Sequence, residues 1–268
     1  MIKLIATDMD GTLLNDKKQL PAEFPEVLKE LWKIGITFAI ASGRSKPALI
    51  ELFGELAEDL IFICDNGACV QMPHKEPVLK CLPVSAVNKA LDLCKTLDDV
   101  VPVLCGVKNI YYPVSAKEQF QKEITNFYVN FLSVPYEELY NISDDIIKIA
   151  ICDLHNPSNN SYPVFLSLFG DEYELAISGA MWMDMMCKDV SKGNAVHTLQ
   201  KELNITSEET MVFGDYGNDV SMFPYAYYSY AMDNASDEIK NQANFIAPSN
   251  NENGVMKIIC KILNLNCF

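Results

Sequence analysis

Hydrophobic residues near the start of the chain follow the pattern of a parallel α/β sheet. Short apolar runs at 3–7, 36–41 and 60–64 end at turn residues, which is typical of buried strands. Between them, apolar residues recur at helical spacing over 21–34 and about 46–56. Strands that alternate with helices in this order predict a parallel sheet covered by helices.

The pattern changes in the middle of the chain and then returns. Helical patterns at 84–97, 117–132 and 162–169 alternate with β-prone segments at 101–104, 109–114, 146–152 and 173–178. A helical pattern at 193–203 and an apolar strand at 210–213 then resume the first arrangement. We therefore expect one domain made of residues 1–82 and 188–268, with a second α/β unit, residues 83–187, inserted into it.

Charge and composition exclude several classes of protein. Lys+Arg 21 against Asp+Glu 36 gives the 268-residue chain a formal net charge of −15. A nucleic-acid binder neutralises phosphates with clustered Lys and Arg, and no basic run occurs, so we expect no nucleic-acid partner. Hydrophobic residues at 49% allow a large core and exclude intrinsic disorder.

The sequence predicts a cytoplasmic protein without a membrane partner. No apolar stretch reaches the length of about 18 residues that a membrane span needs, and the N-terminus does not resemble a signal peptide. The nine cysteines are odd in number and widely spaced, so we expect reduced thiols. The closest cysteine pair is Cys64 and Cys69 and the three histidines are scattered, which disfavours a zinc site.

The first candidate site is Asp8-Met9-Asp10-Gly11-Thr12, directly after the first apolar run. The carboxyl ends of parallel strands are where open α/β sheets bind ligands. Extended residues two apart point the same way, so Asp8 and Asp10 can face one site, and Gly11 lets the backbone turn tightly. Two such carboxylates favour a nucleophile or metal ligand beside a proton donor. The alternative is a solvated turn.

The segment Gly214-Asp215-Tyr216-Gly217-Asn218-Asp219 follows another apolar strand and brings further acids to a strand end. Together with Asp8, these acids can form a cation site. A few carboxylate and carbonyl oxygens with room for water and a substrate phosphate suit Mg²⁺ better than Ca²⁺. The alternative for the segment is a further Gly/Asn/Asp turn with Asp219 as the N-cap of a helix, and for Asp219 both interpretations can hold.

Two more segments carry candidate phosphate ligands. Ser42-Gly43-Arg44 follows the second strand, where a hydroxyl and free N–H groups before a helix favour an anion. Arg44 is the sole arginine of the chain, which suggests a bidentate contact that lysine cannot make. Lys192 opens a helix, where a positive charge is unfavourable unless it neutralises a phosphoryl group and nearby carboxylates. Otherwise Ser42 is a helix cap and Lys192 an exposed surface lysine.

In this order and spacing, the four segments resemble the haloacid dehalogenase superfamily of phosphotransferases. The insertion, together with ASGR, VSKG and the stretch Ala231-Met232-Asp233-Asn234-Ala235, is similar to the Cof-type subfamily (type IIB), which carries a large α/β cap. The resemblance implies an α/β fold: a Rossmann-like three-layer core with a parallel sheet, plus an inserted α+β cap domain that selects the substrate.

The resemblance also implies a role for each matching residue. Asp8 is the nucleophile that forms an aspartyl-phosphate, Asp10 is the acid and base, and Lys192 contacts the phosphoryl oxygens. The metal site is a Mg²⁺ site formed by Asp8, the backbone carbonyl of Asp10, Asp215 and, nearby, Asp219. The residues expected to bind the phosphate or the substrate are Met9, Gly11, Ser42, Gly43, Arg44, Asn66 and Asn218.

The expected activity is a Mg²⁺-dependent phosphatase acting on small phosphorylated metabolites, with sugar phosphates first among them. A phosphomutase of the same superfamily is the alternative, and a non-catalytic regulatory protein is disfavoured because every acid and Lys192 are present. A dehalogenase is disfavoured because that branch of the superfamily lacks the second acid, at the position of Asp10. A dinucleotide-binding dehydrogenase is excluded because no G-x-G-x-x-G motif follows the first strand. Nothing in the sequence indicates the oligomeric state.

Overall fold

The computed structural model describes residues 1–127 and 131–265, which form two compact units. Unit 1 comprises Met1–Val78 and Ser191–Phe268, and unit 2 comprises Leu79–Val190. The boundaries expected from the sequence, after residue 82 and before residue 188, differ from this division by a few residues.

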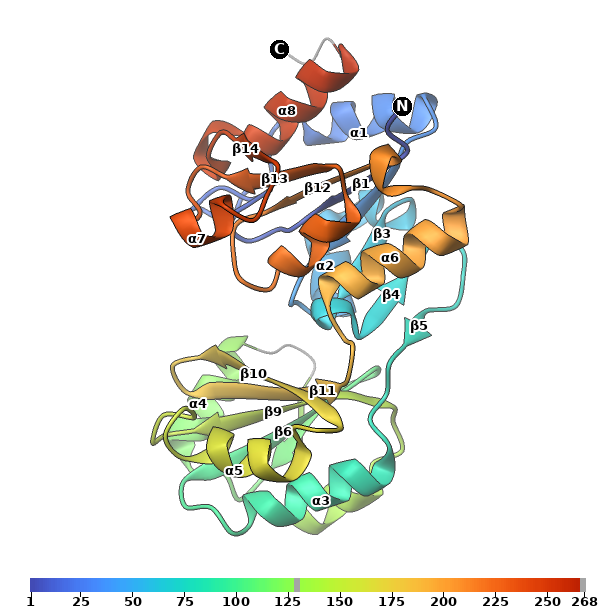
Figure 1. Cartoon of the computed structure of the whole chain (residues 1–268). Coiled ribbons are helices and arrows are strands. Elements are labelled where there is room, and N and C mark those ends of the chain that lie inside the picture. The colour runs from blue at the N-terminus through green and yellow to red at the C-terminus, as the bar shows by residue number, and fades with distance from the viewer. Residues whose placement is uncertain (128–130, 266–268) are drawn as a thin grey trace. The chain divides into compact units, whose positions relative to one another are not determined.

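Unit 1 is built on a sheet in the strand order β14-β13-β12-β1-β2-β3-β4-β5 (Figure 1). The strands from β14 to β3 run parallel, and β4 is antiparallel to β3. Its strands are β1 (Leu4–Thr7), β2 (Thr37–Ala41), β3 (Ile61–Cys64), β4 (Cys69–Gln71), β5 (Val78–Leu79), β12 (Thr210–Gly214), β13 (Tyr228–Met232) and β14 (Phe245–Ala247). Its helices are α1 (Phe24–Lys33), α2 (Lys46–Phe53), α6 (Lys192–Leu203), α7 (Asp237–Lys240) and α8 (Gly254–Leu263).

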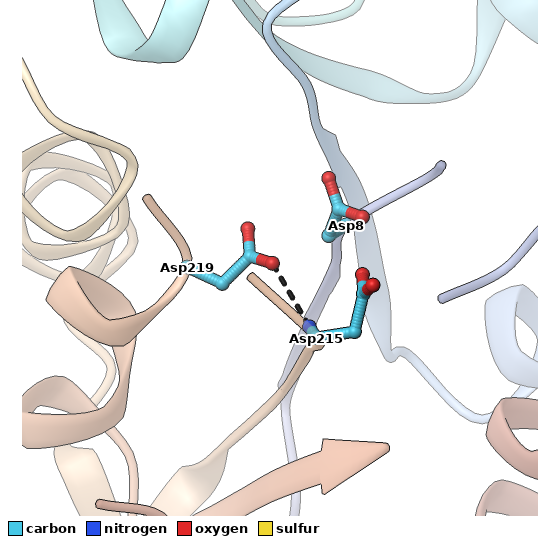
Figure 2. Close-up of side chains that lie close together, drawn as sticks. All are labelled: Asp8, Asp215 and Asp219. Carbon is cyan, nitrogen blue, oxygen red and sulfur yellow. Dashed lines mark hydrogen bonds between the residues drawn. The ribbon is translucent and has the colours of Figure 1, made fainter. Parts of the chain in front are cut away.

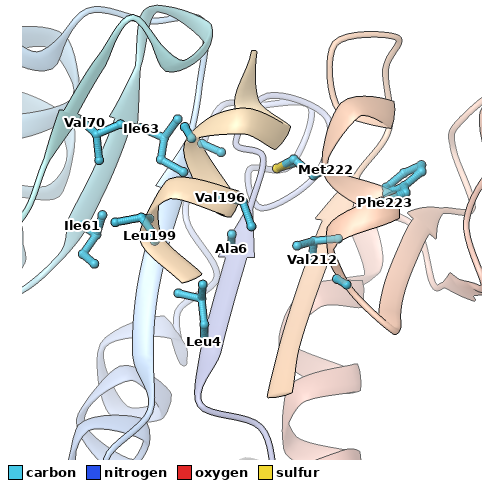
Figure 3. Packing of buried hydrophobic residues seen from close by; sticks show 14 of the residues in the cluster. Leu4, Ala6, Ile61, Ile63, Val70, Val196, Leu199, Val212, Met222 and Phe223 are labelled. Carbon is cyan, nitrogen blue, oxygen red and sulfur yellow. The ribbon is translucent and has the colours of Figure 1, made fainter. Parts of the chain in front are cut away.

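Helices cover both faces of this sheet, which makes three layers. On one face, Val196 and Leu199 of α6 pack on Leu4 and Ala6 of β1, as Figure 3 shows, together with residues of the short helix η5 (Val220–Tyr225). On the other face, Phe24 of α1 contacts Phe38 of β2 with ring centroids 5.6 Å apart. The central strands β1, β2, β3 and β12 are buried on both sides, so they have nearly continuous apolar sequences, as is typical of parallel strands. The predicted fold class is confirmed for this unit.

Unit 2 contains a six-stranded sheet in the order β10-β11-β9-β6-β7-β8. Its pairings are antiparallel except for β7 with β8. The strands are β6 (Val100–Gly106), β7 (Ile110–Pro113), β8 (Phe131–Val134), β9 (Ile146–Asp153), β10 (Tyr173–Gly179) and β11 (Trp182–Cys187), and the helices are α3 (Val84–Cys94), α4 (Glu118–Phe127) and α5 (Ser161–Phe169). This mixture of antiparallel strands and helices is the predicted α+β unit.

Two expectations from the sequence are wrong in detail. The helix expected over 117–132 is α4, which ends at Phe127, and β8 begins at Phe131 because that segment pairs with β7; residues 128–130 lie outside the described part. Seven of the described cysteines are free, whereas Cys260 is disulfide-bonded, so reduced thiols are not found throughout.

Candidate active site

The predicted site residues of unit 1 lie where neighbouring parallel strands end. Asp8 follows β1, Ser42 follows β2 and Asp215 follows β12. Since β1 pairs with β12 on one side and with β2 on the other, these positions share one edge of the sheet. The Asp8 backbone N–H extends this pairing by donating to the Phe213 carbonyl at 2.9 Å. The topology therefore brings together segments that are far apart in sequence.

Lys192 lies at the centre of the site and is buried, with a relative exposure of 1%. Its Nζ donates to Oδ1 of Asp8 at 2.6 Å and to Oδ1 of Asp219 at 2.7 Å. Burial alone would lower its pKa, but the two carboxylates raise it above the usual value, so the amine stays charged. The reading of Lys192 as an exposed surface residue is therefore wrong.

Close packing holds Lys192 in this position. Ser191 caps helix α6, because its side chain accepts the N–H of Asn194 at 3.1 Å. The next residue, Gly193, lies against η5, and a Cβ there would meet the Ser221 carbonyl oxygen at 1.8 Å. Glycine is thus required at this position for α6 to approach η5 and to present Lys192 to the acids.

Asp219 organises the loop that carries Asp215. Its Oδ2 accepts the backbone N–H groups of Asp215 at 2.9 Å and of Tyr216 at 3.0 Å, while its Oδ1 binds Lys192. Asp219 occupies the N-cap position of η5, as the sequence also suggests, but its side chain makes no cap hydrogen bond there. Both of its oxygens are engaged in fixing the loop and the lysine.

Asp8, Asp215 and Asp219 form a cluster of three carboxylates with ligand atoms within 4.8 Å of one another (Figure 2). Thr12 orients Asp215 by donating to its Oδ1 at 2.7 Å. Gly11, with φ +89, allows this approach, since a Cβ would lie 2.4 Å from Oδ2 of Asp215. Burial, followed by the charge of Asp219, raises the pKa of Asp8 to about 7, although Lys192 opposes the shift.

The crowding of these acids suits a divalent cation. Burial also raises the pKa of Asp215, and Asp219 adds to that shift. One lysine therefore faces three carboxylates, and a cation would relieve the remaining repulsion. Since Asp219 is already engaged at both oxygens, Asp8 and Asp215 are the side chains that fit a metal, and oxygen donors of this kind are those that Mg²⁺ prefers.

The Asp10 carboxylate is not part of this cluster. Nε of Arg44 donates to its Oδ2 at 2.9 Å, and Nη2 of Arg44 and Nζ of Lys18 donate to its Oδ1 at 2.7 and 2.8 Å. Burial would raise the pKa of Asp10, but the hydrogen bonds from Arg44 and Lys18 outweigh it and hold that pKa below its usual value. The predicted bidentate contact of Arg44 is thus made with Asp10.

The other predicted ligands are placed in different ways. Ser42 is buried and its Oγ accepts the N–H of Arg44 at 3.1 Å. Asn66 lies in the short helix η2 (Asp65–Gly67) after β3, and its Oδ1 accepts from Asn218 at 2.9 Å. A Cβ on Gly43 would contact Asn66, so these segments adjoin. The Met9 side chain is buried in the core, which leaves only its backbone for a ligand.

Three functional candidates were not assigned a role from the sequence. Thr12 belongs to the first segment, and its spacing gave no hint of the bond to Asp215. Lys18 stands in a polar turn without any pattern of its own. Asn234 belongs to the stretch 231–235, and its Nδ2 donates to the Gly11 carbonyl at 2.8 Å, which supports the loop after β1.

A family model described as haloacid dehalogenase-like hydrolase matches residues 5–259. The chain belongs to this family. It is 32% identical over 267 residues to the 5-amino-6-(5-phospho-D-ribitylamino)uracil phosphatase YbjI of Escherichia coli, covering 98% of this chain and 96% of the relative. A putative phosphatase of Bacillus subtilis, YxeH, is 31% identical over 275 residues, covering 98% and 99%.

Solved structures agree with this assignment. A sugar phosphatase of subclass IIB of the superfamily, BT4131, superposes with a TM-score of 0.79 and is 25% identical in sequence. The match covers 98% of this chain and 99% of the BT4131 chain. This haloacid dehalogenase-like chain is accordingly an enzyme of the phosphatase type with a Rossmann-like core and a cap. No helix in the described part of the chain has the length and apolar character needed to cross a membrane.

Proposed function

We propose that the chain is a Mg²⁺-dependent phosphatase of small phosphorylated metabolites, with Asp8 as the nucleophile. The observation that carries the proposal is the position of Asp8: a buried carboxylate at the end of β1, bonded to Lys192 at 2.6 Å and beside Asp215. A nucleophile needs a partner that neutralises the incoming phosphoryl group, and Lys192 and a cation held by the acids would supply that charge.

In the first half-reaction, a carboxylate oxygen of Asp8 attacks the substrate phosphorus. The bond between phosphorus and the leaving oxygen breaks, its electron pair goes to that oxygen, and the oxygen takes a proton from Asp10. Asp10 must be protonated for this step, although Arg44 and Lys18 favour its ionised form. The products are an aspartyl-phosphate and the free alcohol. Lys192 and Ser42 contact the phosphoryl oxygens and stabilise their charge in the transition state.

In the second half-reaction, water attacks the phosphorus of the aspartyl-phosphate and gives its proton to Asp10. Phosphate leaves, Asp8 is restored and Asp10 is protonated again for the next substrate. The contacts of Asp10 suit the base of this step, since Arg44 and Lys18 hold it as an acceptor of N–H groups. With a side-chain exposure of 35%, Asp10 can also exchange protons with water.

Asp8, Asp215 and the backbone carbonyl of Asp10 would hold the metal ion, while Asp219 fixes the loop of Asp215. When bound, Mg²⁺ would neutralise the charge that the phosphoryl group and the acids bring together. The donor set is all oxygen. Burial, followed by the charge of Asp219, raises the pKa of Asp8 to about 7, and a cation would favour the ionised carboxylate against both effects.

For the substrate, we propose phosphorylated sugars and sugar alcohols, selected by unit 2 acting as the cap. Two observations support this class: BT4131 is a sugar phosphatase, and the relative from Escherichia coli acts on a phosphoribitylamino-uracil.

The test is phosphate release from a panel of hexose phosphates, pentitol phosphates, the phosphoribitylamino-uracil and nucleotides, with Mg²⁺ or with EDTA. We expect release that requires Mg²⁺ and ranks the sugar and polyol phosphates first. Undiminished release in EDTA would contradict the metal assignment. Isomer formation from a hexose 1-phosphate without phosphate release would favour the phosphomutase alternative, in which a sugar hydroxyl replaces water.

A further inference from the structure

The sole arginine of the chain binds the second acid of the site with a fork-shaped contact. Nε of Arg44 donates to Oδ2 of Asp10 at 2.9 Å and Nη2 donates to Oδ1 at 2.7 Å. Two parallel bonds fix the plane of a carboxylate, which a single lysine amine cannot do. The residue that composition singles out therefore contacts the acid and base of the reaction.

Lys18 also contacts the Asp10 carboxylate, and hydrogen bonds fix the turn in which Lys18 lies. Asn15 Oδ1 accepts the N–H groups of Lys17 at 2.9 Å and of Gln19 at 3.0 Å, which shapes the turn in which Lys18 has φ 59. Asp16 of the same turn is tied to a distant segment, since Asn250 and Asn251 donate to its carboxylate at 3.1 and 2.9 Å.

The segment that anchors this turn also anchors the loop after β1. Asn250 is buried; its Nδ2 donates to the Leu14 carbonyl at 3.0 Å, and its N–H donates to Oδ1 of Asn234 at 3.1 Å. Asn234 in turn binds the Gly11 carbonyl. This network of asparagines thus fixes the backbone before the turn that carries Lys18 and holds Asp16 within the turn.

Stability gives little reason for the contact to Asp10. The Lys18 side chain is 60% exposed, and an exposed ion pair contributes about 0–1 kcal/mol at most to the free energy of unfolding. A network of this size around one half-exposed carboxylate is better explained by the orientation that proton transfer requires, because misplacement by about 1 Å can cost two orders of magnitude in rate.

We propose that Arg44 and Lys18 are positioning residues that act through Asp10, fixing its carboxylate for proton transfer, and that Arg44 is not primarily a phosphate ligand. The inference rests on the proposed function. From the sequence, the guanidinium of Arg44 is expected to contact the phosphate instead. The two roles can be distinguished, because only a positioning residue should lose its effect on the rate when Asp10 is replaced.

The test is a double-mutant cycle on kcat/KM for a sugar phosphate that the wild type hydrolyses, because its poor leaving group needs the proton of Asp10; release of ³²P-labelled phosphate keeps slow variants measurable. Arg44→Met, Arg44→Lys and Lys18→Met are each made alone and together with Asp10→Asn. With Asp10 present, we expect Arg44→Met to lower kcat/KM by about 10- to 100-fold, Arg44→Lys by less, and Lys18→Met by about 3- to 10-fold. With Asp10→Asn, each further loss is expected to fall below about twofold.

The matched control is Lys3→Met. Lys3 makes a similar exposed ion pair, 2.6 Å from Glu209, at the opposite end of β1. Its replacement is expected to leave kcat/KM within about twofold of wild type. A loss for Arg44→Met that is equally large in both backgrounds would overturn the inference, because it would show that Arg44 acts on the substrate independently of Asp10.

Inhibition by inorganic phosphate gives a second measurement that does not need the Asp10 variant. The inhibition constant of phosphate for Arg44→Met should stay within about twofold of wild type, and a value tenfold weaker would assign Arg44 to the phosphoryl group. A wild-type protein that releases no phosphate from any substrate contradicts the proposed function itself. If the wild type is active but the losses of kcat/KM caused by the Arg44 and Asp10 substitutions are additive, only the positioning of Asp10 by Arg44 is contradicted.

Discussion

The two units differ in how their buried charged side chains are paired. In unit 1, three carboxylates lie around one lysine, Lys192, and burial, followed by the charge of Asp219, raises the pKa of Asp8 to about 7. In unit 2, buried charges are matched: Lys148 lies 3.5 Å from Asp184, and Asp153 accepts the N–H and hydroxyl of Ser161 at the start of α5. Groups whose charges remain unbalanced mark a site for a ligand, whereas matched ones support a fold.

The largest effect that this comparison predicts is on Asp8. Asp8→Asn keeps the shape of the side chain but removes the nucleophile, so kcat for phosphate release should fall by about 10⁴-fold or more. Circular dichroism should show an unchanged fold. A variant that kept a tenth of the wild-type rate would remove Asp8 from the proposed mechanism.

Lys192→Met should be nearly as severe. The variant leaves Asp8 and Asp219 buried without their cation, so we expect kcat to fall by about 10³-fold and the protein to lose about 3–5 kcal/mol of stability. Steady-state kinetics and urea unfolding would measure the two effects. If both parameters stayed close to those of wild type and of Lys3→Met, the buried lysine would have no part in the chemistry.

Asp215→Asn tests the cation site. Loss of one carboxylate should raise the Mg²⁺ concentration for half-maximal activity by about 10- to 100-fold, and excess Mg²⁺ should restore part of the rate. A titration of activity against Mg²⁺ measures this. An unchanged requirement for Mg²⁺ would place the metal elsewhere.

The raised pKa of Asp8 predicts a change in stability with pH in metal-free protein. Because the carboxyl has a pKa of about 7 in the folded chain against an ordinary value of 3.8, the stability that it contributes is full below about pH 4 and is lost as the pH rises through about 7. In EDTA at pH 8, Asp8→Asn should therefore melt about 5 °C above wild type, with a smaller difference at pH 5. Thermal melts of both proteins at the two pH values would measure this difference. Equal melting temperatures at pH 8 would contradict the prediction.

The smallest effect on chemistry is expected in unit 2. Lys148→Met removes one partner of a buried pair, so the melting temperature should fall by several degrees. Hydrolysis of p-nitrophenyl phosphate per folded molecule should change by less than about threefold, since Lys148 is not among the residues that contact Asp8 or Asp10. A large loss of rate without loss of stability would show that unit 2 shares in the chemistry.

The same contrast explains what the sequence could predict. The acids of unit 1 could be found because each follows a short apolar strand, and parallel strands bring their carboxyl ends to one edge. The three-layer fold followed from the alternation of strands and helices. The bond between Arg44 and Asp10 was not foreseeable, since it joins residues 34 positions apart and the pattern gives no distance.

The secondary structure of unit 2 was harder to predict from the sequence, for physical reasons. Whether a segment forms a strand depends strongly on the neighbours it packs against, so local propensity decides less there. The helical period before Phe131 extends into a segment that pairs as β8, and β11 is rich in methionine, which gives no strong strand signal. Lys18 could not be identified either, because an exposed lysine in a turn has no distinguishing pattern.

The central claim is that Asp8 carries the phosphoryl group, and trapping that intermediate tests it most directly. Wild-type protein would be mixed with a ³²P-labelled sugar phosphate and Mg²⁺, quenched in acid after milliseconds, and digested for peptide mapping. We expect the label on the peptide that contains Asp8, released by hydroxylamine as acyl phosphates are, and absent from Asp8→Asn. Label on another residue, or rapid turnover without any labelled protein, would contradict the mechanism.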